Sequence, residues 1–264
     1  MYRQHFGLTG WPLEKNTNTL FDSDQLAELQ SRFQWLQESP GIGILTGEAG
    51  VGKTAALRQL TASLNPHRYQ VIYLPDTDCS RRDLYRNLAI ALGLEPAYRR
   101  TTLWRDIKEK VVDLVDNKGV QPIWIIDEAQ NLPVSFFRDF PAFLNYTFDS
   151  RDMMIVWLVG LPQLSYTLDR SPNAALASRI HVRVHLTPMQ DHATFQALIS
   201  HAFKEVGCTQ TLLSDSGLEL LRQASQGKPR QAGQILKAAL KLAVPKGLNH
   251  LPDDLIQEAV EVLR

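Results

Sequence analysis

The sequence predicts an α/β fold, in which a mainly parallel sheet lies between two layers of helices and a smaller helical domain follows. Residues 47–54 match the pattern G-x-x-x-x-G-K-[ST] and stand between a short apolar run and a segment of helical character. Two later apolar runs, residues 123–126 and 154–159, are continuous, as is typical of parallel strands covered on both faces. After Thr187-Pro188 only helical patterns remain. We therefore expect an α/β domain over residues 1–186 and a helical domain over residues 187–264.

The composition is that of a globular protein without overall charge. Of its 264 residues 44% are hydrophobic and 21% are charged, and the formal net charge is zero, so any affinity for nucleic acid must come from local patches. Cys79 and Cys208 match no zinc or redox spacing, and we expect thiols in a reducing cytosol. No apolar run approaches the ~20 residues of a membrane helix, and the first ten residues lack the apolar core of a secretory signal. We expect a cytoplasmic protein without a membrane partner.

The elements of the α/β domain follow from periodicity. Residues 1–22 have no regular period, and we expect an arm that packs on the core or also lines an adenine pocket. Apolar side chains at helical spacing predict a helix that begins after Asp22-Ser23-Asp24: Leu26, Leu29, Phe33 and Leu36. The other expected elements are strands over 42–46, 69–74, 123–126, 154–159 and 182–186, and helices over 55–64, 82–92, 103–115, 136–148, 163–168 and 174–179.

The helical domain is predicted from four amphipathic segments, residues 192–205, 214–226, 230–244 and 253–263. Glycine or proline interrupts the pattern at Gly207, at residues 227–229 and at residues 245–247. This spacing predicts a small bundle with short connections.

Residues 47–54 predict a phosphate-binding loop, the Walker A pattern. Glycines let consecutive backbone N–H groups point inward at a triphosphate, and the following helix adds the positive end of its dipole. Lys53 is expected to reach the β- and γ-phosphates and the Thr54 hydroxyl to hold Mg²⁺. A chance glycine-rich turn is the alternative, which the flanking strand and helix disfavour. The residues expected to bind ATP are Glu48, Ala49, Gly50, Val51, Gly52, Lys53, Thr54 and Ala55.

Two carboxylates, Asp127 and Glu128, end the apolar run at residues 123–126. In this arrangement, the Walker B pattern, the first acid binds Mg²⁺ through water and the second orients and deprotonates the attacking water. The alternative is a solvated strand end. An apolar run that ends in Asp-Glu is a weak signal alone, but it is a strong one about seventy residues after a phosphate-binding loop.

Short segments spread over almost the whole chain carry a resemblance to one protein family. They are residues 5–8 (His-Phe-Gly-Leu), 45–48 (Leu-Thr-Gly-Glu), 127–132 (Asp-Glu-Ala-Gln-Asn-Leu), 158–164 (Leu-Val-Gly-Leu-Pro-Gln-Leu), 178–180 (Ser-Arg-Ile) and 227–230 (Gly-Lys-Pro-Arg). With these pieces the sequence resembles the AAA+ ATPases, in particular the branch with the ExeA-type secretion ATPases and the transposition ATPases TniB, TnsC and MuB. The resemblance implies a three-layer αβα P-loop domain followed by a helical lid.

The resemblance also implies roles for two arginines. Arg179 matches the arginine finger that enters a neighbouring subunit's site and stabilises charge on the γ-phosphate. The alternative is an arginine in a surface ion pair. Arg170 is the nearest other candidate for the finger. Arg230 matches the lid arginine, sensor 2, which points back at the nucleotide; an arginine without a ligand at the start of a helix is the alternative. Together with Lys53 and Glu128 these arginines form the expected catalytic set.

One departure from the family pattern lies at the end of the strand over residues 154–159. Many AAA+ proteins carry a polar residue there, sensor 1, whereas here Gly160 follows and Gln163 is the nearest polar side chain. Either Gln163 substitutes or the sensor 1 interaction is missing, which would fit slow, assembly-stimulated hydrolysis suited to a switch. Gln130 could relay between Glu128 and a neighbour, or it could be an ordinary helix cap.

Local charge gives the only clue to what the ATPase acts on. Residues 98–105 combine cations, hydroxyls and aromatics in an expected loop, a set suited to phosphate contacts, and a second basic stretch covers residues 222–246. Solvated helix faces are an equal alternative for either stretch alone. The candidate DNA contacts are Arg81, Arg82, Arg99, Arg100, Thr101 and Arg105.

The resemblance favours an ATP-dependent, DNA-binding regulator of transposition. Such a protein would assemble on double-stranded target DNA as a homo-oligomer, a ring or a filament with hexameric turns, and recruit or stimulate a transposase, with a further targeting protein as a third partner. The alternatives are an ExeA-like ATPase in secretion or envelope assembly and a signalling or loader ATPase. Secretion ATPases of this kind usually carry a membrane segment and a peptidoglycan-binding region after the ATPase, and we expect neither here.

Overall fold

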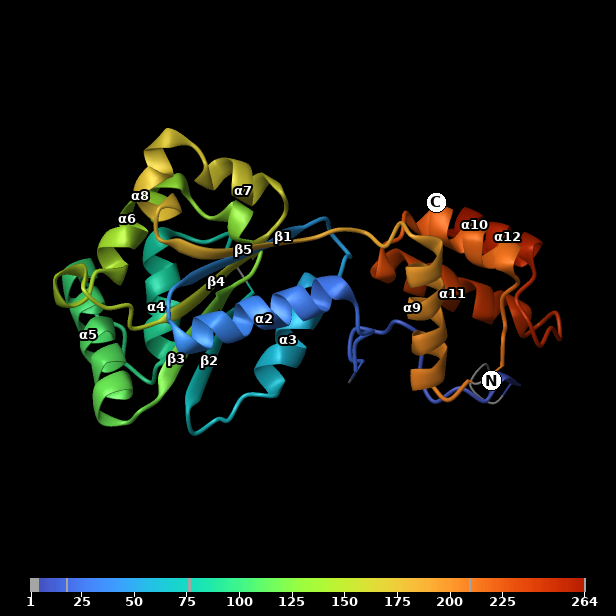
Figure 1. The fold of residues 1–264 in the computed structure, drawn as a ribbon, viewed down its shortest axis with the longest axis horizontal. Coiled ribbons are helices and arrows are strands. Elements are labelled where there is room, and N and C mark those ends of the chain that lie inside the picture. Colours follow the sequence, from blue (N-terminus) through green and yellow to red (C-terminus); the bar gives the residue numbers. More distant parts are fainter. Residues whose placement is uncertain (1–4, 18, 76, 209, 264) are drawn as a thin grey trace. The chain divides into compact units, whose positions relative to one another are not determined.

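The computed structural model describes residues 5–17, 19–75, 77–208 and 210–263 (Figure 1). Contacts divide the chain into two compact units. Unit 1 comprises Met1–Ser23, Glu48–Gln59 and Thr187–Arg264, and unit 2 comprises Asp24–Gly47 and Leu60–Leu186. The sequence assigns residues 1–23 and 48–59 to the α/β domain, whereas their contacts group them with the helices that follow Thr187.

Unit 2 is built on a five-stranded sheet in the order β2-β3-β4-β1-β5. All four pairings between these strands are parallel, as predicted. Parallel strands end at the same edge, so the residues that follow β3 and β4 lie at the edge from which β1 leads into the Walker A loop. The strands are β1 (Ile42–Gly47), β2 (Tyr69–Leu74), β3 (Gln121–Ile126), β4 (Ile155–Gly160) and β5 (Ile180–Leu186).

Alternation along the strands places helices on both faces of the sheet. Trp124 and Ile126 of β3 point into a core shared with α4 (Arg81–Ala91), α5 (Arg100–Val112) and α6 (Val134–Leu144). On the other face the Phe33 ring of α2 (Asp24–Glu38) stacks on Trp157, with ring centroids 5.8 Å apart. Figure 1 shows α2 lying across that face. The predicted three-layer arrangement is confirmed, and the short helices α7 (Gln163–Leu168) and α8 (Ala174–Ala177) connect β4 to β5.

Two predicted boundaries in this unit are wrong. The loop expected over residues 98–105 is helical from Arg100, because the Arg100 guanidinium lies 4.3 Å from the centre of the Trp104 ring one turn later and Leu103 and Ile107 give the segment a buried face. The helix expected to reach residue 148 ends at Leu144. Beyond it Thr147, Phe148 and Asp149 have φ values of +50°, +57° and +62°, which an α-helix cannot contain.

Unit 1 contains the helix that follows the Walker A loop, α3 (Lys53–Ala62) as far as Gln59, and the bundle predicted from the C-terminal sequence. The helices of the bundle are α9 (His192–Glu205), α10 (Asp215–Ser225), α11 (Pro229–Ala243) and α12 (Asp253–Val262). Leu8 and Trp11 of the N-terminal arm are buried in the same core, and the Thr9 N–H donates to the carbonyl of Val206 at 2.9 Å. The arm is therefore an integral part of the helical core.

No helix in the described part of the chain has both the length and the apolar character that crossing a bilayer requires.

Candidate nucleotide-binding site

The Walker A loop has the backbone that its glycines predict. Gly50 and Gly52 have φ values of +89° and +105°, a region that favours glycine. The Ala56 N–H donates to the Gly52 carbonyl at 2.9 Å, which starts α3 directly after the loop. The buried Lys53 side chain folds back over the loop, and its Nζ donates to the Glu48 carbonyl at 3.0 Å. The loop, the cation and the helix N-terminus are thus assembled as a phosphate site requires.

The turn that precedes α11 contacts this loop. The Arg230 N–H donates to the Gly50 carbonyl at 3.2 Å, and a Cβ at Gly50 would lie only 3.2 Å from the Arg230 Cβ. The Lys228 Nζ forms an ion pair with Glu48 Oε2 at 2.6 Å. The start of α11 at Arg230 therefore packs against the loop through its backbone and Cβ. Lys228 was not among the residues predicted from the sequence, although its place inside the matching residues 227–230 was a signal.

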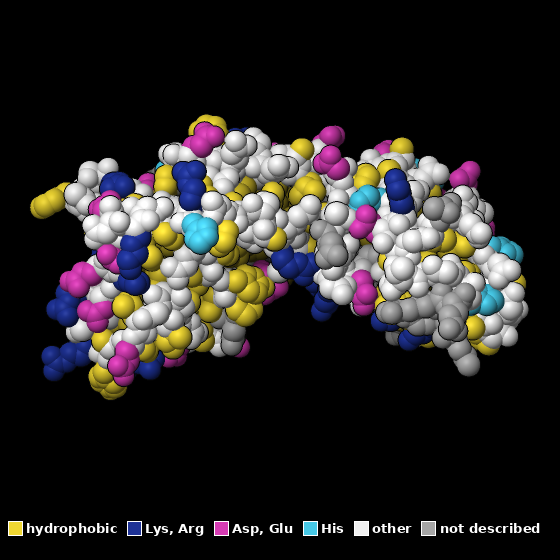
Figure 2. Space-filling view, turned by 90° about the horizontal axis from the view of Figure 1, so that it is seen from below, with side chains coloured by type: hydrophobic (Ala, Val, Ile, Leu, Met, Phe, Trp, Pro, Cys, Tyr) yellow, Lys and Arg dark blue, Asp and Glu magenta, His cyan; other side chains and the backbone are white. Residues whose placement is uncertain are grey.

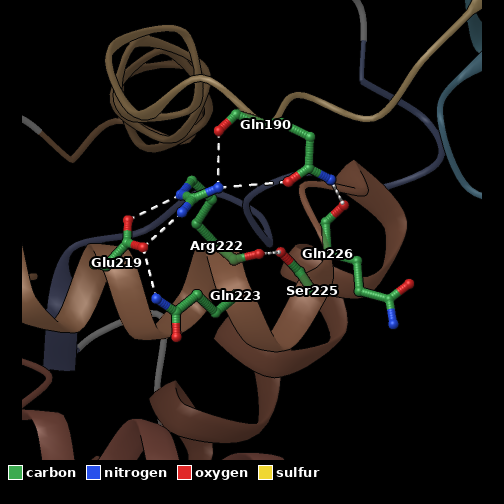
Figure 3. Close-up of polar contacts among 6 residues, drawn as sticks. All are labelled: Gln190, Glu219, Arg222, Gln223, Ser225 and Gln226. Atoms are coloured by element: carbon green, nitrogen blue, oxygen red, sulfur yellow. Dashed lines mark hydrogen bonds and ion pairs between the residues drawn. The ribbon is translucent and has the colours of Figure 1, made fainter.

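A polar network holds the turn before α11 within the bundle of helices α9 to α12, the expected lid (Figure 3). Arg222 binds both carboxylate oxygens of Glu219, at 2.8 and 2.5 Å, and its Nη1 donates to the Gln190 carbonyl at 2.7 Å. The Gln190 amide donates to the carbonyl of Gln226, which is in the left-handed conformation with φ +54°. A Cβ at Gly227 would come within 2.4 Å of the Met189 carbonyl, so only glycine fits there.

The lid should lose stability in acid through this network. The hydrogen bonds from Arg222 and then Gln223 lower the pKa of Glu219 from 4.5 to about 2. Since the folded pKa lies below the unfolded one, the stabilisation is complete above about pH 4.5 and is lost as the pH falls towards 2. Urea unfolding at several pH values should show Glu219→Gln less stable than the parent at pH 7, with the difference shrinking between pH 4.5 and 2. A difference independent of pH would contradict this role for the Glu219 charge.

Asp127 is the first residue after β3, and it is buried. Its Oδ1 accepts from the Glu128 N–H at 2.9 Å, and its Oδ2 accepts from the Tyr73 hydroxyl on β2 at 2.8 Å. The carboxylate is therefore held in a fixed orientation at the edge where the strands end. Oxygen donors of this kind suit Mg²⁺. Tyr73 was not singled out from the sequence, because its approach depends on the pairing of β2 with β3.

Glu128 is exposed and has φ +51°, an uncommon conformation for a residue with a side chain. Neighbouring side chains contact its carbonyl and its carboxylate. The buried Thr77 hydroxyl donates to the Glu128 carbonyl at 2.8 Å, and the Gln130 amide donates to Glu128 Oε2 at 2.7 Å. The carboxylate that sequence analysis assigned as general base is thus available to a ligand and oriented by neighbouring side chains.

The other residues considered from the sequence lie in unit 2 on the segment from α7 to β5. Arg179 follows α8, and its guanidinium forms an ion pair with Asp149 at 2.5 Å. Arg170 is exposed before the short turn Ser171–Asn173. Gln163 is exposed at the first turn of α7.

The candidate DNA-contacting residues lie on α4, on α5 and between them, and several have partners within the chain. Arg81 and Arg100 both pair with Asp139, Arg82 lies over the ring of Tyr98, and Arg105 pairs with Asp106 and Glu109; Thr101 is exposed on the first turn of α5. The face in Figure 2 carries basic and acidic side chains interspersed. Arg99 is exposed, and it belongs to none of the ion pairs found among the described residues. The cationic character of this stretch is therefore weaker than its sequence suggests.

A parallel sheet, a glycine-rich loop after β1, a carboxylate pair after β3 and a helical lid together define the class of P-loop ATPases. Within this class, the family described as AAA domain matches residues 36–168, half of the chain. The chain belongs to this family, and its activity is the hydrolysis of ATP.

Named relatives agree with this assignment. The chain is 29% identical over 253 residues to general secretion pathway protein A of Aeromonas hydrophila; the match covers 94% of this chain and 46% of that protein, so the chain spans about half of its relative. Its fold is similar to the Aeropyrum pernix ORC2 protein, with a TM-score of 0.68, 18% identity, and coverage of 98% of this chain and 71% of that one. It is also similar to Drosophila ORC bound to DNA, with a TM-score of 0.70, 15% identity, and coverage of 100% and 65%.

Proposed function

We propose that this ATPase is a DNA-binding switch that regulates transposition. With ATP bound it would assemble as a homo-oligomer on duplex DNA and recruit or stimulate a transposase, and a further targeting protein would join the assembly. Hydrolysis would release it. The proposal is supported by the resemblance to transposition ATPases and by the exposed pair Tyr98 and Arg99, which offers an aromatic ring and a cation at the start of α5.

The ATP cycle assigns a task to each part of the site. Lys53 would neutralise the β- and γ-phosphates, and Arg230 would report their state to the lid through the turn that touches Gly50. Mg²⁺ would be held by Thr54 and, through water, by Asp127; a hydroxyl and a carboxylate are donors that this ion prefers. Glu128 would take the proton of the attacking water.

Arg179 would complete the site of a neighbouring copy. Its ion pair with Asp149 would then be broken on assembly, because the guanidinium cannot serve both partners in the same geometry. This assignment makes hydrolysis dependent on assembly, as a switch requires.

Duplex-DNA binding should depend on Arg99. In sedimentation with a non-hydrolysable ATP analogue, Arg99→Glu should reduce the amount of protein bound to long DNA, because a cation that faces phosphate is replaced by an anion. The slope of log affinity against log salt should fall by about 0.9 for each phosphate that the variant no longer neutralises. Arg32→Glu on α2, the same charge reversal at a half-exposed site, should bind like the parent. Equal binding by both variants would remove Arg99 from the interface, and no DNA binding by the parent in any nucleotide state would exclude the DNA role.

A second candidate function is that of an ATPase assisting secretion or envelope assembly. The similarity to general secretion pathway protein A over 94% of this chain favours it. Such a protein would hydrolyse ATP without any dependence on duplex DNA, so ATPase rates with and without DNA distinguish the two functions. Electron microscopy of the protein with the ATP analogue, with and without DNA, would separate a ring from a filament.

A further inference from the structure

The carboxamide of Gln130 bridges the ends of two strands in unit 2. Gln130 lies in the short turn Ala129–Asn131 that follows Glu128. Its Nε2 donates to Glu128 Oε2 at 2.7 Å, and its Oε1 accepts from the Leu161 N–H at 3.0 Å. Leu161 directly follows β4. A peptide N–H can only donate and a carboxylate can only accept, so a glutamine, which does both, is the side chain that fits between them.

Gly160 makes room for this bridge. A Cβ at Gly160 would lie 2.5 Å from the Gln130 Oε1, which is far inside van der Waals contact. The φ of Gly160 is not in the left-handed region, so the backbone itself would accept alanine. The absence of a side chain at the end of β4 is therefore explained by the glutamine that reaches it from the end of β3.

From this geometry we infer that Gln130 is a positioning residue for hydrolysis: it holds the Glu128 carboxylate at a fixed distance from the end of β4. The inference rests on the proposed role of Glu128 as general base. Gln130 itself touches neither water nor phosphate in this role. It places a polar group at the end of β4, where the family pattern expects one.

The Glu128 backbone adds a reason why such a tether is needed. Glu128 has φ +51° and an exposed side chain, and exposed side chains change rotamer readily unless a contact holds them. The Thr77 hydroxyl contacts the Glu128 carbonyl, whereas the Gln130 amide contacts its carboxylate. Small misplacements of a catalytic group reduce rates steeply, by about 100-fold for 1 Å.

Steady-state ATPase kinetics of Gln130→Ala test the inference. The expected result is a kcat about 10- to 100-fold lower with KM and ATP affinity within about twofold of the parent, because only the orientation of the base is disturbed. Gln34→Ala, the same change at an exposed site on α2, should leave both constants unchanged. A Gln130→Ala variant with parental kcat, or one whose defect lies in KM, would overturn the inference.

A double-mutant cycle with Gly160 separates positioning from folding. Gly160→Ala should by itself lower kcat, because the new Cβ displaces the carboxamide, but it should have no further effect in Gln130→Ala, where that atom is absent. Additive effects would contradict the bridge. In the Glu128→Gln background Gln130→Ala should also change little. If Glu128→Gln alone hydrolyses ATP normally, the proposed role of Glu128 fails, and this result is distinct from a failure of Gln130.

Discussion

Replacing Glu128 by glutamine should leave a protein that binds ATP and hardly hydrolyses it. The carboxamide has the shape of the carboxylate but cannot accept a proton from the attacking water, and a general base contributes about 10²- to 10⁴-fold to a rate. Single-turnover hydrolysis should therefore fall by about this factor, while the affinity for a fluorescent ATP analogue should stay within about threefold. The variant should accumulate in the assembled, ATP-bound form.

A matched control is available on α2. Glu28 is a half-exposed glutamate, and Glu28→Gln should hydrolyse ATP at the parental rate. Turnover of Glu128→Gln within twofold of the parent would mean that another group activates the water.

Replacing Lys53 by alanine should act one step earlier, on binding. The Lys53 ammonium is buried, and its Nζ bonds the loop carbonyl of Glu48, so in the complex it would exchange this hydrogen bond for phosphate oxygens. Hydrogen bonds that involve a charged group contribute about 1.5–3 kcal/mol, which corresponds to about 10- to 150-fold in the dissociation constant of ATP. Isothermal titration should show this weakening, with hydrolysis at saturating ATP reduced as well.

The control for this variant is a lysine outside the loop. Lys204 is exposed on α9, and Lys204→Ala should bind ATP like the parent. Parental affinity in Lys53→Ala would show that the phosphates are held elsewhere.

Much of the fold could be predicted because local pattern and tertiary environment agree. The strand over residues 69–74 and the helix over residues 192–205 have the predicted bounds, since an unbroken periodicity ends at each of them. The phosphate loop was predictable for a similar reason, because Gly50 and Gly52 can adopt the positive φ values that the loop requires. These signals come from neighbouring residues in the sequence and do not depend on contacts with distant segments.

The sequence does not predict contacts whose two residues are far apart along the chain. Nothing near residue 100 shows that Arg100 will pair with Asp139, so the partial neutralisation of this cationic stretch could not be predicted. The hydrogen bond between Gln130 and the Leu161 N–H likewise depends on β3 and β4 being neighbours, and the order of the strands is a property of the whole sheet. The grouping of the N-terminal arm with the lid has no local signature either.

The burial of Leu8 and Trp11 among the C-terminal helices also bears on biosynthesis. Their partners in this core include Phe195, Leu236 and Ile256, which are synthesised more than 180 residues later. Such long closures slow folding, and they leave the apolar stretch around Trp11 in need of protection until the helices of the bundle have been synthesised. The lid is therefore the part of this ATPase that we expect to mature last and to depend most on chaperones.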